Sequence, residues 1–93
     1  SQNFPNPFNA VTTLRFSLPE ESFVSVAVYD ILGQEIATLA NRQAYGAGNH
    51  ALIWDGRNNA GRMMSTGVYL YRMEAFSGGK AIFQDARKLI MLK

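Results

Sequence analysis

Apolar side chains in this chain recur at every second position, and this period of two restricts its fold more than any other feature. Leu14, Phe16 and Leu18 alternate with polar residues, and valines repeat the pattern over Val24–Val28. In an extended strand this spacing places all the apolar side chains on one face, whereas an amphipathic helix needs them three and four positions apart. We therefore predict half-buried β-strands in both stretches.

Turn-forming residues divide the rest of the chain. Asp30–Gly33 indicates a short hairpin loop in which Gly33 supplies a positive φ, and Asp55–Gly61 is the strongest turn signal in the sequence. Asn41–Asn49 is interpreted as a longer, flexible connection. The intervening segments are predicted to be strands: Gln34–Leu39, His50–Asp55, Val68–Ala75 and Lys80–Lys93. The last is one long strand or two short ones, and the register of its hairpin stays open.

Short strands, frequent turns and the lack of a sustained helical period predict an all-β fold, an antiparallel β-sandwich of about seven short strands. The valine face, Trp54 and the tyrosines are expected to form its core, with Tyr69 and Tyr71 on one face of their strand. The 93 residues suffice for a single domain, residues 1–93, and packing alone must stabilise it because the chain has no cysteine. Its abrupt start and short length indicate a domain excised from a larger protein.

The polar residues argue against several classes of function. The formal charge is only +2 and the basic residues are scattered, apart from Arg87, Lys88 and Lys93, so a nucleic-acid interface is not predicted. No apolar run approaches the length of a membrane span. His50 is the only histidine and the carboxylates are dispersed in turns and strands, so no acid–base or nucleophilic site can be assembled. The sequence predicts a protein that is not an enzyme.

Asp55, Asn58 and Asn59 form the best candidate metal site. Hard oxygen ligands on a glycine-bearing loop suit Ca²⁺, although their spacing departs from the EF-hand pattern. A plain turn in which these side chains bond to the backbone explains the same residues. Both interpretations stay open, and no cofactor other than calcium is considered.

Aromatic residues outside the predicted core leave carbohydrate binding open. Tyr29, Tyr45, Phe76 and Phe83 are predicted to be accessible, and a sugar platform needs two or three such rings in one plane. Spacing along the sequence does not establish that plane. A carbohydrate-binding or cell-attachment module of a secreted hydrolase is therefore one alternative function.

Phe4, Pro5, Asn6, Pro7 and Phe8 form a stiff, aromatic lead-in to the first strand. The prolines fix their own φ and bias the preceding residues towards extended backbone. This domain-entry motif is interpreted as a lid over the core, as a recognition epitope at the domain boundary, or as both.

Several blocks of the sequence jointly resemble the C-terminal sorting domains of the type IX secretion system. They follow one another in order along nearly the whole chain: Gln2–Asn9, Thr12–Pro19, Val28–Ile36, Trp54–Arg57, Gly61, Ser65–Arg72 and Arg87–Lys93. The same blocks are similar to the immunoglobulin-like domain of the flagellar hook-capping protein. Either resemblance implies an immunoglobulin-like sandwich.

The sorting resemblance, favoured by the position of the terminal block, implies a non-catalytic signal that directs a cargo protein across the outer membrane. Its partners would be the type IX translocon, a sortase-like peptidase and an N-terminal cargo domain. The protein would reach the surface or medium through the periplasm of a Gram-negative bacterium. The recognised element is expected to be the terminal strand, Lys88, Leu89, Ile90, Met91, Leu92 and Lys93, leaving the sheet at modest cost. A structural immunoglobulin-like spacer is the other alternative.

Overall fold

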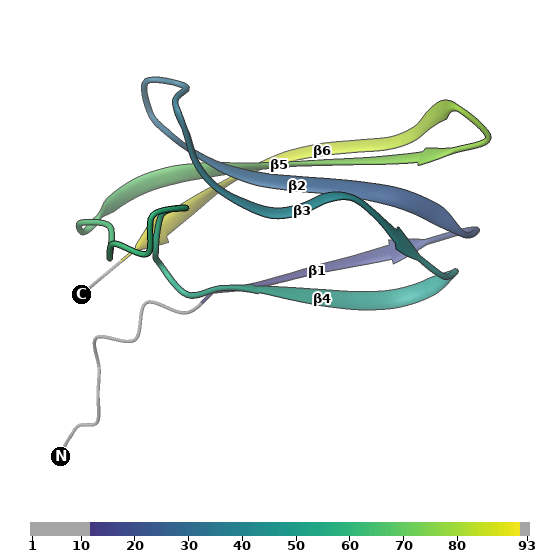
Figure 1. Ribbon diagram of the computed structural model, residues 1–93, viewed down its shortest axis with the longest axis horizontal. Helices are drawn as coiled ribbons and strands as arrows, with labels where there is room; N and C mark the ends of the chain where they lie inside the picture. Colours follow the sequence, from purple (N-terminus) through teal and green to yellow (C-terminus); the bar gives the residue numbers. More distant parts are fainter. Residues whose placement is uncertain (1–11, 92–93) are drawn as a thin grey trace, which may run out of the picture.

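The computed structural model describes residues 12–91, which form two antiparallel sheets packed face to face (Figure 1). Six strands occur in this part of the chain: β1 (Thr12–Leu18), β2 (Ser22–Asp30), β3 (Glu35–Tyr45), β4 (Gly48–Trp54), β5 (Gly67–Ser77) and β6 (Lys80–Met91). β1 pairs with β4, and the second sheet has the order β3-β2-β5-β6. The predicted all-β, immunoglobulin-like sandwich is confirmed, with six strands where about seven were expected. Over the described residues, no helix is long and apolar enough to span a membrane.

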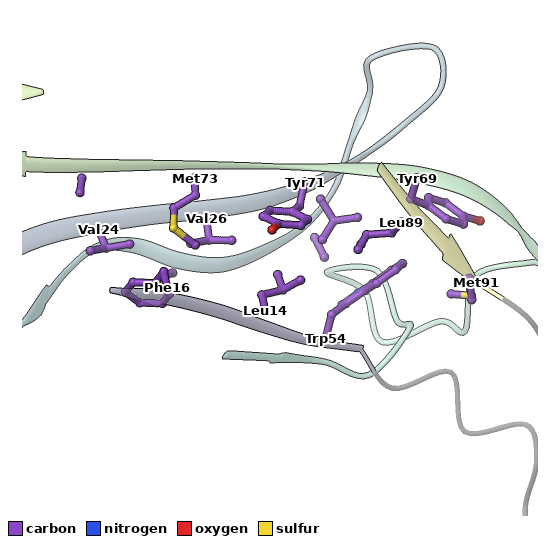
Figure 2. Close-up of a cluster of buried hydrophobic side chains, with 14 of the residues drawn as sticks. Leu14, Phe16, Val24, Val26, Trp54, Tyr69, Tyr71, Met73, Leu89 and Met91 are labelled. Carbon is purple, nitrogen blue, oxygen red and sulfur yellow. The ribbon is translucent and has the colours of Figure 1, made fainter. Parts of the chain in front are cut away.

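The core lies between the two sheets and is built by the period-two pattern (Figure 2). Leu14, Phe16 and Leu18 of β1 face the valines of β2, all of them buried. Tyr69 and Tyr71 are buried on the inner face of β5, as predicted. The Tyr69 hydroxyl donates a hydrogen bond to the carbonyl oxygen of Ser65 at 2.7 Å, which satisfies a polar group at the edge of the core.

The prediction of a long connection over Asn41–Asn49 is wrong. β3 continues to Tyr45 and β4 starts at Gly48, so only a tight turn separates them. The reason is that β3 is bulged: between the pairs Val24↔Gln43 and Val26↔Ala40, two of its residues oppose the single β2 residue Ser25. Arg42, with φ of 50°, lies in this irregular stretch. Each extra residue shifts the alternation by one position, so the sequence pattern of a strand disappears while the strand continues.

The last hairpin resolves the register that the sequence leaves open. Gly78 and Gly79, with φ of 60° and 79°, form a two-residue turn between the paired residues Ser77 and Lys80. A bulge follows, because Ala75 pairs with Phe83 but Phe76 pairs with Ala81, which leaves Ile82 as the extra residue. The segment after the turn is therefore one long strand that stays paired with β5 as far as Met91.

Candidate functional site

The loop after β4 is held by its own side chains. The Oδ1 atom of Asp55 accepts a hydrogen bond from the backbone N–H of Arg57 at 3.1 Å. The Oδ1 atom of Asn58 accepts two, from the N–H groups of Ala60 at 3.0 Å and Arg62 at 2.9 Å. The carbonyl oxygen of Arg57 in turn accepts the indole N–H of Trp54 at 2.9 Å. The side-chain bonds thus hold the turn in shape, and the Trp54 bond attaches it to the core.

Asn59 attaches the same loop to the outer edge of β3. Its backbone N–H donates to the carbonyl oxygen of Ile36 at 3.0 Å, and its Oδ1 atom accepts from the N–H of Thr38 at 2.9 Å. The oxygens of all three candidate calcium ligands therefore accept backbone hydrogen bonds. Residues 12–91 also contain no cluster of three or more histidine, cysteine or acidic residues that could hold a metal. Calcium binding stays a prediction, and the alternative of a side-chain-stabilised turn accounts for every one of these bonds.

Replacing Asn58 by alanine should cost the domain about 1–3 kcal/mol of unfolding free energy, because two backbone N–H groups lose their acceptor. Chemical denaturation followed by circular dichroism measures the loss. Asn41→Ala is the matched control, since Asn41 is exposed on β3, and it should change stability by less than about 0.5 kcal/mol. If millimolar Ca²⁺ raised the melting temperature of the parent but not of Asn58→Ala, the calcium interpretation would gain support.

The His50 side chain packs against two aromatic rings beside the β3–β4 turn. Its Nε2 atom lies 2.7 Å from the carbonyl oxygen of Gly46, within the β3–β4 turn region. Its ring centroid is 5.4 Å from that of Phe16 and 4.9 Å from that of Tyr45. Asp30, one of the dispersed carboxylates, accepts the N–H groups of Leu32 and Gln34 and so stabilises the β2–β3 turn.

The four aromatic residues considered for sugar binding lie in separate places. Tyr29 is at the end of the large sheet beside the β2–β3 turn, whereas Phe76 is at the opposite end, paired with Phe23. The guanidinium of Arg42 covers one face of Phe76, 5.1 Å from the ring centroid. Tyr45 packs edge-on against Phe16, and Phe83 lies on β6. All four are half-buried, and their positions do not form a single platform.

The described part of the terminal strand is built into the sandwich. Leu89 and Met91 face the core, and Met91 is only 3% exposed, whereas Lys88 and Ile90 point outward. Removing this strand from the sheet would expose both inner side chains. Leu92 and Lys93 lie outside the described residues, as does the domain-entry motif of Phe4, Pro5, Asn6, Pro7 and Phe8.

One end of the large sheet carries a group of exposed apolar residues that the sequence analysis missed. It consists of Ile31, Leu32, Val68, Leu70 and Ile90, which we call the apolar corner. Val68 pairs with Ile90 across β5 and β6. Ile31 and Leu32 lie in the β2–β3 turn, which rises from the large sheet on the side away from β1 and β4 (Figure 1). Leu32 is 80% exposed and Ile90 63%. A signal was present, since Val68–Tyr71 is apolar at every position and so must place apolar side chains on both faces.

Comparison with known proteins now adds the family. The family described as the FlgD Ig-like domain matches residues 6–79, most of the chain. This chain belongs to the FlgD Ig-like domain family. Among solved structures, FlgD from P. aeruginosa aligns with a TM-score of 0.70 and 27% sequence identity, over 86% of this chain and 60% of that one. The present chain thus spans about three fifths of that FlgD chain. No curated protein matches it.

The FlgD match corrects the leading prediction from the sequence. The chain was expected to be a type IX sorting signal with a translocon and a sortase-like peptidase as partners, and the family found is FlgD instead. The physical reason is that the resembling blocks specify the fold. Val28–Ile36 contains the β2–β3 turn, and Trp54–Arg57 contains a core tryptophan and the turn that satisfies it. Residues of this kind are required by the sandwich fold that both families would share, and they carry no information about binding partners. The cell-surface location stays a prediction.

Proposed function

We propose that this FlgD Ig-like domain is a non-catalytic structural module that makes protein–protein contacts in a flagellar hook-capping assembly. The observation that carries the proposal is the family match over residues 6–79, supported by the alignment with FlgD from P. aeruginosa. The dispersed carboxylates and the packed His50 fit a scaffold role, since neither is part of a catalytic constellation. Of the functions considered from the sequence, the structural immunoglobulin-like domain is the one that agrees with the family.

The apolar corner supports the contact role. Neighbouring exposed apolar side chains, such as the paired Val68 and Ile90, favour an interaction site, because leaving them in water is unfavourable and burying them in an interface recovers that free energy. Lys88 pairs with Leu70 across β5 and β6 and brings a positive charge to the border of the cluster. An apolar centre with a charged border is the usual anatomy of a protein–protein interface.

A domain exchange tests this function. Residues 6–91 of this chain replace the Ig-like domain of FlgD from P. aeruginosa, and hook assembly and swimming are scored in a strain that lacks its own FlgD. We expect the exchanged protein to support hooks, and Ile90→Asp to abolish them because a carboxylate would enter the apolar corner. Ile53→Asp is the matched control: Ile53 is also 63% exposed, but it lies on β4 in the other sheet.

The outcome that contradicts the proposal is a folded, exported exchange protein that builds no hooks. Equal hook formation by Ile90→Asp and Ile53→Asp would retain the scaffold role and remove the apolar corner from it. Circular dichroism of each isolated domain verifies that the substitutions leave the fold intact.

A further inference from the structure

The small sheet of the sandwich ends at β1, whereas the large sheet continues to β6, which extends past the edge of β1. β1 pairs only with β4 among the described strands, while the facing sheet has four strands. The inner-facing positions of β6 run through Phe83, Asp85 and Arg87 before reaching the core residues Leu89 and Met91. Charged side chains occur at Asp85 and Arg87 because no strand of the small sheet covers them. The result is a groove of about 550 Å³ between the inner face of β6 and the small sheet, where residues of β1 and also Asn49 and His50 of β4 line it.

The groove combines an apolar floor with basic walls. Phe16, Met73 and Phe83 contribute the apolar surface, and Arg15 and Arg87 line the two sides. Asp85 contacts the Nε atom of Arg87 at 2.9 Å, which leaves the two terminal nitrogens of that guanidinium as further donors. Arg15 forms no ion pair within residues 12–91. One carboxylate against two guanidinium groups gives the groove a net positive charge.

We propose that this groove binds an extended segment of a partner protein, in which acidic and apolar residues alternate, as an added strand on the edge of β1. An edge strand presents a row of unpaired backbone N–H and C=O groups, and a peptide that pairs with it gains main-chain hydrogen bonds. Alternate side chains of the added strand point to opposite faces of the sheet. Its apolar side chains enter the groove above Phe16 and Phe83, and its carboxylates, on the opposite face of the added strand, lie beside Arg15, which is on the outer face of β1.

The charges of the domain itself argue for a different protein as the occupant, rather than a second copy of this chain. If a second copy paired through its own β1 edge, it would place another Arg15 at the groove. If it paired through its β6 edge, it would place Arg87 and Lys88 there. Like charges placed in one groove repel. In a second copy, the outer edge of β3 is occupied at Ile36 and Thr38 by Asn59. The edge of β4 contains no acidic residue that could pair with Arg15. This inference rests on the proposed function, because it assigns a partner chemistry to a domain whose role is to make protein contacts.

The test is a nuclear magnetic resonance titration of the isotope-labelled chain with a short synthetic peptide that alternates valine and glutamate. We expect chemical-shift changes at the backbone amides of β1 and at residues lining the groove. A peptide that alternates valine and lysine should bind at least about tenfold more weakly, as should the Arg15→Glu variant towards the glutamate peptide. Arg62→Glu, in the loop after β4, is the matched control and should bind the glutamate peptide as the parent does.

Three results would overturn the proposal: no shift changes with the glutamate peptide, equal affinity for the lysine peptide, or changes confined to the apolar corner. Self-association of the free chain through β1, seen by sedimentation, would also overturn it by making a second copy the occupant. Because the titration uses the isolated chain, its outcome is separate from that of the domain exchange. Peptide binding without hook assembly would count against the proposed function, and hook assembly without peptide binding would count against this groove alone.

Discussion

Replacing Trp54 by alanine should remove a large part of the stability of this domain. The indole is 1% exposed, packs against Tyr69 with ring centroids 5.5 Å apart, and donates its N–H to the carbonyl oxygen of Arg57. Truncating a buried tryptophan costs about 3–5 kcal/mol, and the lost hydrogen bond adds to that cost. A small domain typically has only about 5–15 kcal/mol of unfolding free energy in total. Urea denaturation followed by far-ultraviolet circular dichroism gives the change directly.

Trp54→Phe separates the two contributions. Phenylalanine keeps an aromatic ring in the core but has no N–H, so the carbonyl oxygen of Arg57 loses its donor while most of the packing is retained. We expect a loss smaller than that of Trp54→Ala. A Trp54→Ala variant with the urea midpoint of the parent would show that the core does not depend on this side chain.

The second large effect is expected at the end of β6. Leu89 and Met91 are buried in the core, and truncating each to alanine should cost about 2–5 kcal/mol. The double variant Leu89→Ala/Met91→Ala should therefore lose a cooperative thermal transition. The expectation from the sequence was different, since this strand was predicted to leave the sheet at modest cost.

Ile90→Ala is the control for the same strand. Ile90 lies between the two buried residues but points to solvent, so its truncation should change stability by less than about 0.5 kcal/mol. The melting temperatures of both variants, measured by calorimetry, test whether inward and outward side chains alternate along β6 as described. Equal destabilisation by the inward and the outward substitutions would contradict the placement of β6 in the sandwich.

The sequence predicted the parts of the fold in which local pattern and tertiary position agree. β1, β2 and β5 keep a strict period of two, so the buried faces carrying Leu14, Val26 and Tyr71 could be assigned correctly. β3 could not be traced to its end, because its bulges shift the alternation and Arg42 adopts a positive φ. Such bulges are specified by the pairing with β2, and no local pattern of residues encodes them.

The candidate surfaces were less predictable than the strands. Asn59 was recognised as a turn residue, but its attachment to β3 depends on the loop folding back against a strand far away in the sequence. The groove arises because two strands face four, and this difference is a property of the complete topology. The resemblance failed for a related reason, since residues that build turns and core are shared by domains with unrelated partners.

The pairing of β1 with β4 also has a consequence for the order of folding. β2–β3 and β5–β6 are hairpins whose partners are adjacent in the sequence, whereas β1 reaches β4 only across the whole of β2 and β3. Closing that long loop costs entropy before any contact of the small sheet is made. We expect the two hairpins to form early and the nonlocal pairings, β1 with β4 and β2 with β5, to form later, with folding times in the range of roughly milliseconds to seconds that nonlocal β-sandwiches show. A newly made chain would meanwhile expose the valine face of β2, and during that interval it would be most vulnerable to aggregation.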